Sequence, residues 1–342
     1  MNTTLANYYQ GFTSAGDAWP PLPLADAPEL AWWQQLIGAS TGGILTGKSL
    51  LGALEDALPQ LQLPQVVGIS GSELYKALVL QGEASVAEGA GLPWDHPEAL
   101  RLWIAPHPCG AMPVLETPSW QDFVLLIRAL AHRGEPICLA DGVHAQAISG
   151  LIHWGLIAQF GRQSRARLIV LHQAPYGSVA ARDVPGGLSD SAWLAASTRL
   201  RLEHELTHLA TKRLLGEMRL NLLDELIADC MGMVAALGAF HAGLFGHCLG
   251  IDENGLPIAN GRWLSYTKDL TPDESRQAIQ LLMQRARELV AALKNQPELL
   301  ISDCSMRRLQ WLCKQNLMQP IQPADNLATT TECAEAEKLS SQ

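Results

Sequence analysis

Residues 192–215 read AWLAASTRLRLEHELTHLATKRLL and contain the pentapeptide HELTH at residues 204–208. The stretch has no Gly or Pro and is rich in Ala, Leu, Glu and Arg, which favour helices. Asp190 or Ser191 can cap its start, and Gly216 is placed to end it. The sequence therefore predicts one long helix that carries the pentapeptide near its middle.

The pentapeptide has the residue types and the spacing of a metal site. His204 and His208 are four positions apart, so on a helix their imidazoles share one face and can bind a common ion. Imidazole suits zinc, which takes three protein ligands in catalytic sites and leaves a position for water. Glu205 is rotated by about 100° from His204, given about 3.6 residues per turn, and so flanks that face. There it can take a proton from a water that the metal has made acidic.

A second helix is expected to begin near Asn221, a favourable N-cap residue, with Asp224 three positions later. Glu225 falls in its first turn, and Asp229 lies one turn further along the same face. A short turn between the helices can bring Glu225 beside the histidines as the third, anionic ligand. Asp229 then orients a ligand histidine. Two alternatives stay open, in which Asp224 or Asp229 is itself the third ligand.

The two motifs together, HELTH and then DELIAD at residues 224–229, resemble the gluzincin class of zinc metallopeptidases. Thermolysin-like enzymes of that class carry HELTH before an N-E-x-x-x-D stretch. The resemblance covers about residues 200–232 and implies a zincin-like fold and a peptide or another amide as the substrate. It also implies residue roles: Zn2+ ligands His204, His208 and Glu225, general base Glu205, and an orienting carboxylate, Asp229.

The remaining candidates concern the open position at the metal. Enzymes of this type commonly stabilise the oxyanion with a downstream His or Tyr, and by position the candidates are His241, His247 and Tyr266. A second hypothesis is a non-haem Fe(II) oxygenase, because two histidines and one carboxylate also form its facial triad. That chemistry has little use for a glutamate base. A third is a catalytically inactive binding or regulatory protein, in which Cys230 or His241 closes the fourth position.

Composition limits the wider picture. The 342 residues are 48% apolar and 17% charged, which is enough for one large core or two smaller ones. A net charge of −10 without a basic stripe argues against nucleic acid or anionic lipid as the partner. Seven cysteines without a C-x-x-C pair are typical of free thiols in a reducing cytosol. Residues 1–19 lack the features of a secretory signal, so we expect a cytoplasmic protein. The oligomeric state is not predicted.

Two stretches partly match the sequence patterns of other functions. Residues 231–251 are free of Asp, Glu, Lys and Arg but contain five glycines and two histidines, so a buried helix is expected there instead of a membrane span. Residues 42–49 (GGILTGKS) match the phosphate-binding pattern G-x-x-x-x-G-K-S. Such a loop needs a buried strand just before it, whereas residues 32–40 are helix-like and then polar. We therefore expect a glycine-rich turn.

The rest of the chain predicts a mixed architecture. Short apolar runs predict strands at residues 66–69, 102–105, 137–140 and 168–172, and helical spacing predicts helices at 28–37, 49–58 and 120–132. The expected class is α+β, with a mixed α/β region at residues 1–165 and a zincin-like, mainly helical metal-binding region at 166–322. A disordered polar tail is expected at 323–342. Residues 167–172 are either the edge strand that holds a peptide substrate or an internal strand.

Overall fold

The computed structural model describes residues 3–14, 16, 18–38, 44–83, 91–139, 142–149, 151 and 167–324. The chain forms two compact units. Pro21–Ala174 is the sheet unit, and Met1–Pro20 together with Pro175–Gln342 is the helical unit. The strand at residues 167–172 thus belongs with the mixed α/β part of the chain, and the first twenty residues belong with the helical part. The predicted disordered tail lies outside the described residues from residue 325 onward.

The sheet unit contains a five-stranded sheet in the order β1-β2-β3-β5-β4. The strands are β1 (Ile44–Thr46), β2 (Arg101–Ala105), β3 (Met112–Thr117), β4 (Ala145–Ser149) and β5 (Arg167–His172). β3 and β5 run parallel, and the other neighbouring pairs are antiparallel. The predictions of strands at 102–105 and 168–172 are confirmed. β5 pairs with a strand on each side, so the edge-strand alternative for residues 167–172 is wrong.

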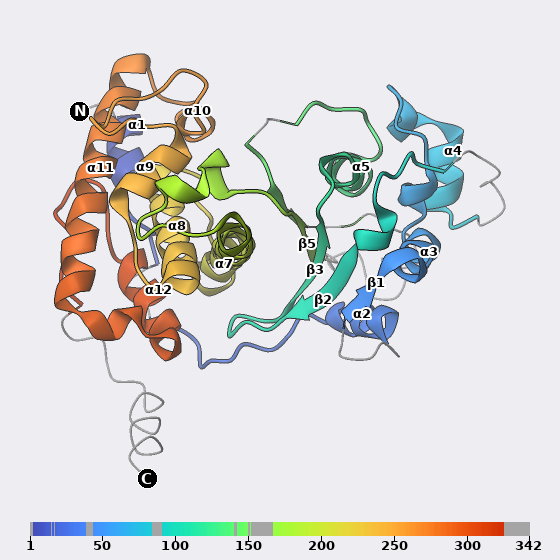
Figure 1. The fold of residues 1–342 in the computed structure, drawn as a ribbon, viewed down its shortest axis with the longest axis horizontal. Helices are drawn as coiled ribbons and strands as arrows, with labels where there is room; N and C mark the ends of the chain where they lie inside the picture. Colours follow the sequence, from blue (N-terminus) through green and yellow to red (C-terminus); the bar gives the residue numbers. More distant parts are fainter. Residues whose placement is uncertain are drawn as a thin grey trace, which may run out of the picture. The chain divides into compact units, whose positions relative to one another are not determined.

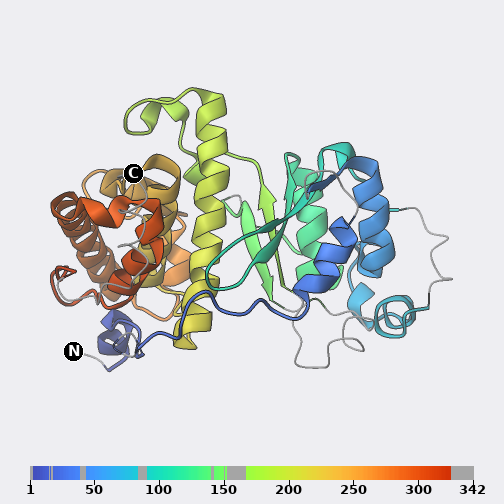
Figure 2. The ribbon, with the colours of Figure 1, turned by 90° about the horizontal axis from the view of Figure 1, so that it is seen from below.

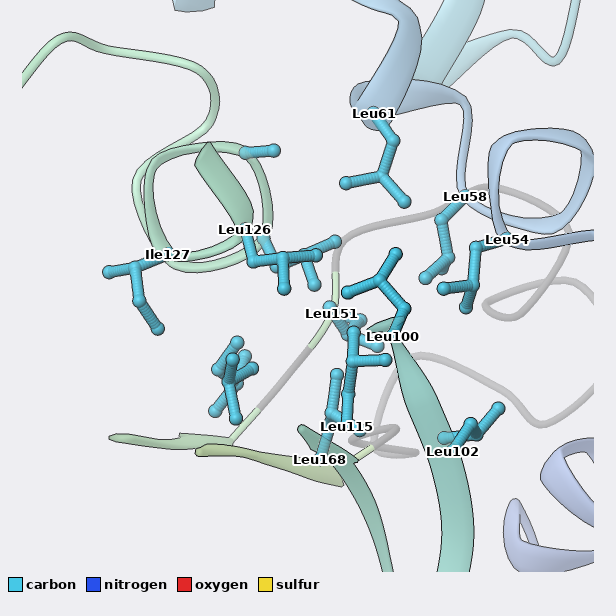
Figure 3. Packing of buried hydrophobic residues seen from close by; sticks show 14 of the residues in the cluster. Leu54, Leu58, Leu61, Leu100, Leu102, Leu115, Leu126, Ile127, Leu151 and Leu168 are labelled. Atoms are coloured by element: carbon cyan, nitrogen blue, oxygen red, sulfur yellow. The ribbon is translucent and has the colours of Figure 1, made fainter. Parts of the chain in front are cut away.

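Helices of the sheet unit form one hydrophobic core with the sheet, as Figure 3 shows. They are α2 (Leu30–Ile37), α3 (Gly47–Ala57) and α5 (Trp120–Ala131), and their bounds are close to the three predicted helix ranges. The sheet unit also contains shorter helical segments: α4 (Glu73–Tyr75), Pro59–Gln62, Ile69–Gly71, Lys76–Leu80 and Pro97–Ala99. Leu168 and Val170 lie two positions apart on β5 and both enter this core. That spacing is the period of two that places alternate strand residues on one face.

Two predicted strands are wrong. Residues 66–69 form a turn and the start of a short helical turn, and Val67 is 88% exposed. Residues 137–139 lie outside any strand, with Ala140 beyond the described residues. The Ile137 N–H donates to Glu135 O, and its carbonyl accepts from Arg128 Nε, so local partners use the groups that a sheet would need. An apolar run forms a strand only where a neighbouring strand can pair with it.

Residues 42–49, which match the phosphate-binding pattern, are only partly described, because Gly42 and Gly43 lie outside the described residues. Ile44–Thr46 form β1, which pairs antiparallel with Arg101–Trp103, and α3 begins directly at Gly47. The expectation of a glycine-rich turn is therefore wrong for the middle of the motif. A phosphate-binding loop turns its backbone N–H groups to the ligand, whereas here the residues between the glycines belong to a sheet.

The helical unit contains α1 (Thr3–Tyr9), α7 (Asp190–Leu215), α8 (Leu222–Leu237), α9 (Ala242–Leu249), α10 (Trp263–Tyr266), α11 (Pro272–Asn295) and α12 (Ser305–Cys313). Further short helical turns are Tyr176–Ser178, Ala181–Asp183, Pro297–Leu300 and Ser302–Cys304. Figure 1 shows α7, α11 and α12 around α8, and Figure 2 shows α7 along its length. Among the described helices, none has the length and apolar composition that crossing a membrane requires.

The predicted helix boundaries are reproduced by local caps. The N-cap of α7 is Ser189, whose Oγ accepts from the Ala192 N–H, so the predicted caps Asp190 and Ser191 are wrong by one or two residues. The helix ends at the predicted Gly216, which has a φ of 74°. α8 starts at the predicted cap, where the Asn221 side chain accepts from the Asp224 N–H. Gly238, also at a φ of 74°, ends α8 and divides residues 231–251 between α8 and α9. The two helices that carry the motifs are thus terminated by signals in the sequence.

Candidate metal centre

Three side chains from α7 and α8 converge at one point. The Nε2 atoms of His204 and His208 are 3.1 Å apart. Glu225 Oε2 lies 3.6 Å from His204 Nε2, and Glu225 Oε1 lies 3.4 Å from His208 Nε2. Among the described residues these three form the one group whose potential ligand atoms lie within 4.8 Å of one another. All three are buried, with exposed fractions of 6%, 7% and 2%.

The two other acids of the second motif lie behind the histidines. Asp229 Oδ1 is 2.7 Å from Nδ1 of His204, the ring nitrogen that faces away from the cluster. Asp224 Oδ2 lies 3.4 Å from Nδ1 of His208 and also accepts from the Leu220 N–H at 2.9 Å. Both acids therefore contact the outer nitrogen of a histidine, which is the position of a carboxylate that orients a metal ligand. This geometry favours Glu225 over Asp224 and Asp229 as the third ligand.

The donor set fits a cation. A histidine that turns an Nδ1–H toward an outer carboxylate presents the lone pair of its Nε2 on the other side. Here both Nε2 atoms would then face each other and the Glu225 carboxylate, so three acceptors meet in a buried space. Such an arrangement is unfavourable without a positive charge between the acceptors. A divalent ion with nitrogen and oxygen ligands, such as Zn2+, satisfies it.

The electrostatics of the site point the same way. Burial alone would lower the pKa of His208, but the Asp224 and Glu225 carboxylates outweigh it and raise that pKa well above its usual range. Burial alone would raise the pKa of Glu225, but His204, His208 and Arg262 outweigh it and lower that pKa to about 2. The buried acids thus create a field that draws positive charge to the histidines.

Two further side chains complete the surroundings of the ligands. The Arg262 Nη2 donates to Glu225 Oε2 at 3.2 Å and to the Tyr266 hydroxyl at 3.1 Å. The Tyr176 hydroxyl donates to Asp229 Oδ1 and lies 3.3 Å from His204 Nδ1. Burial and the Asp229 carboxylate raise the pKa of Tyr176 well above its usual range, so this phenol keeps its proton. His204 and Glu225 are therefore each hydrogen-bonded to a further residue that restricts their orientation.

Tyr176 and Arg262 were not predicted from the sequence. Tyr176 lies in a short helical turn after β5, and Arg262 directly precedes α10, so neither belongs to a long periodic segment. The only local signal is the spacing of four between Arg262 and Tyr266, which places the two on one face of a helical turn. The guanidinium carbon of Arg262 lies 5.7 Å from the centre of the Tyr176 ring. Only tertiary contact reveals this pair.

The other predicted site residues lie in different environments. Glu205 is half-buried on α7 and, in the described part of the chain, forms no hydrogen bond or ion pair. Tyr266 is brought to the cluster through Arg262, whereas His247 is exposed on α9 and His241 lies at the N-cap of that helix. Burial lowers the pKa of His241 and raises that of Cys230 to about 12.

Neither Cys230 nor His241 joins the ligand group within the residues that the structure describes. The two residues predicted to close the fourth position of a structural metal site are therefore not at the cluster. Three protein ligands are the number that a catalytic zinc site takes.

Comparison with known proteins finds one family. The profile described as "Family of unknown function (DUF7005)" matches residues 4–167 and 162–321. No curated protein and no solved structure matches the chain. The match extends across both the sheet unit and the helical unit, so the family includes both parts of this architecture.

Proposed function

The chain belongs to the DUF7005 family, and we propose that it is a zinc-dependent metallohydrolase that acts on a peptide or another amide. One observation carries the proposal: two imidazoles and one carboxylate, all buried, converge from α7 and α8, while a further carboxylate lies beside the outer nitrogen of each imidazole. Zinc held by such ligands polarises a carbonyl and makes water acidic near neutral pH. The resemblance to gluzincins supports the same choice, and a zincin-like fold is part of this proposal.

The residues of the chain supply the remaining chemistry. Glu205 lies on α7 between His204 and His208 and is half-buried. Its carboxylate has no hydrogen-bond or ion-pair partner among the described residues, so it is available as a general base. It would take a proton from the attacking water and pass it to the leaving amine. Asp229 and Tyr176 hold His204, while Arg262 holds Glu225, so the ligands are ordered before substrate binds.

Tyr266 is the best placed of the three candidates for the oxyanion. Its hydroxyl contacts the guanidinium that also binds Glu225, whereas His247 is exposed to solvent. Burial raises the pKa of Tyr266 above its usual range, and the phenol therefore remains a donor at neutral pH. A neutral donor beside the reacting carbonyl stabilises the charge that develops on its oxygen.

The test begins with the metal. We expect purified protein to contain about one equivalent of zinc by inductively coupled plasma mass spectrometry, and His208→Ala to lose most of it, because a ligand is removed. Equal, negligible metal in both proteins would contradict the ligand assignment. Iron in place of zinc, with oxygen-dependent turnover, would favour the Fe(II) oxygenase, which uses the same three ligands.

Glu205→Gln tests the hydrolysis itself. We expect this variant to keep its zinc and to lose turnover of an internally quenched peptide library by about a hundredfold or more, because an amide cannot accept the proton. Glu203→Gln is the matched control, since it makes the same change two positions away on the same helix. Full activity of Glu205→Gln would exclude this residue as the base.

A further inference from the structure

Tyr8 links two elements of the metal centre that lie far from it in sequence. Its hydroxyl donates to the main-chain carbonyl of Tyr266 at 3.0 Å and accepts from the Leu222 N–H at 3.2 Å. Leu222 is the first residue of α8, and Tyr266 is the last residue of α10. One phenol on α1 therefore joins the start of the helix that carries Glu225 to the end of the helix beside it.

The Leu222 N–H belongs to the unpaired donors at the start of a helix, which need a partner outside the helix. Asn221, the N-cap residue, satisfies another of them through its Oδ1 and donates its Nδ2 to the Tyr8 carbonyl at 3.2 Å. The side chain and the main chain of Tyr8 thus both contact the first turn of α8. Glu225 lies in that turn, three residues after Leu222.

α1 gives Tyr8 a firm support. The Arg219 guanidinium donates to the carbonyls of Asn7 and Gly11 at 2.7 and 3.0 Å, and the Leu317 N–H donates to the Tyr9 carbonyl at 3.0 Å. Tyr9 is fully buried, whereas its hydroxyl has no hydrogen-bond partner in the described part of the chain. The neighbouring tyrosines therefore differ in one respect that matters for a test: only the Tyr8 hydroxyl makes hydrogen bonds.

We propose that Tyr8 is a positioning residue of the metal centre, whose hydroxyl fixes the first turn of α8 against α10. Both partners of this hydroxyl lead to the same carboxylate, because α8 carries Glu225 and α10 carries Tyr266 next to the Arg262 guanidinium that binds Glu225. Loss of the bridge lets the third ligand and its guanidinium partner move apart. This inference rests on the proposed function, in which Glu225 binds the metal.

The bridge requires a neutral phenol, since the hydroxyl donates one hydrogen bond and accepts another. Burial raises the pKa of Tyr8 above its usual range, with a smaller contribution from the negative charge of Glu225, and so keeps the proton on the oxygen. Phenylalanine at this position removes both hydrogen bonds without changing the ring. The substitution is therefore a specific probe of the bridge.

The experiment compares Tyr8→Phe with Tyr9→Phe in the full-length protein. We expect Tyr8→Phe to weaken Zn2+ binding about tenfold in a competition titration with a chromogenic chelator, as loss of a residue that orients a ligand does. The visible spectrum of the Co2+-substituted protein should change, and the amides of the first turn of α8 should exchange faster with deuterium. Tyr9→Phe should change Zn2+ affinity less than twofold and leave the spectrum unaltered, although it deletes the same atom from the next residue.

The outcomes separate the two proposals. If Tyr8→Phe has the same Zn2+ affinity and Co2+ spectrum as the unmodified protein, the positioning role of Tyr8 is overturned, while the metallohydrolase proposal stands. Equal losses in Tyr8→Phe and Tyr9→Phe overturn it as well, because they would reflect general loosening of α1. An unmodified protein that binds neither Zn2+ nor Co2+ instead overturns the proposed function, and with it any role of Tyr8 at a metal.

Discussion

His204 illustrates how the proposed metal ligand is oriented by the residues behind it. Asp229 Oδ1 lies 2.7 Å from its Nδ1, and the Tyr176 hydroxyl donates to the same carboxylate oxygen. A carboxylate that accepts the Nδ1–H leaves the Nε2 lone pair free for a metal and fixes the angle of the ring. Tyr176 in turn restricts the carboxylate, so the orientation of His204 depends on a chain of two residues.

This chain predicts the effect of Tyr176→Phe. Asp229 loses a donor in a buried space, so we expect the free energy of unfolding to fall by about 1–2 kcal/mol. Zn2+ affinity should fall about tenfold. The control is a double-mutant cycle with Asp229→Asn, measured by urea unfolding and chelator competition. The two changes should be non-additive, because they act on one network, and strict additivity would contradict the coupling.

At the scale of elements, the packing of α7 against α8 decides where the ligands meet. A Cβ atom at Gly232 would lie 2.7 Å from the main-chain oxygen of Leu200, so the two helices approach each other more closely than a larger residue allows. His204 follows Leu200 by one turn on α7, and Asp229 precedes Gly232 by about one turn on α8, given about 3.6 residues per turn. The close approach of the helices therefore lies beside the contact between His204 and Asp229.

Gly232→Ala should separate the two helices. We expect it to lower the stability of the metal-free protein by about 1–3 kcal/mol, because the new methyl meets the main-chain oxygen of Leu200, which cannot move freely, and to weaken Zn2+ binding. Gly243→Ala, on α9, is the matched control, since a Cβ there has open space. It should stabilise the protein by about 0.5–1 kcal/mol, as alanine replaces glycine in a helix. Similar effects of both substitutions in urea unfolding would exclude the packing explanation.

At the scale of the whole molecule, the proposed metal centre belongs to one of the two units. His204, His208 and Glu225, together with Tyr8, Tyr176 and Arg262, all lie in the helical unit. The sheet unit has a core of its own, formed by its helices and strands. A ligand stabilises the part of a protein whose folded state binds it. Zinc should therefore act on the helical unit.

Hydrogen exchange followed by mass spectrometry tests this division. Zn2+ added to chelator-treated protein should slow exchange in peptides from α7 and α8, because binding stabilises the folded form of the unit that contains them. Peptides from β2, β3 and β5 should exchange as before. His208→Ala serves as the control and should show no zinc effect. Protection of equal size in both units would contradict a site confined to the helical unit.

The sequence alone determined the local part of this result. It predicted α7, the start of α8 at Asn221 and the shared face of His204 and His208, because helix periodicity and caps depend on residues within about one turn. It also predicted the mixed α/β character of the first part of the chain and the mainly helical second half. Strands were predicted less well, and β1, β3 and β4 were not recognised.

Only the tertiary structure decided which groups meet. From the sequence, three neighbouring acids were all candidates for the third ligand, and the crossing of α8 on α7 places Glu225 at the inner nitrogens with Asp224 and Asp229 behind them. Tyr8, Tyr176 and Arg262 reach the centre from segments that no local pattern connects to it. The strand order likewise depends on partners far along the chain. Contacts of this kind arise when distant segments pack together, so they leave no signal in the spacing of neighbouring residues.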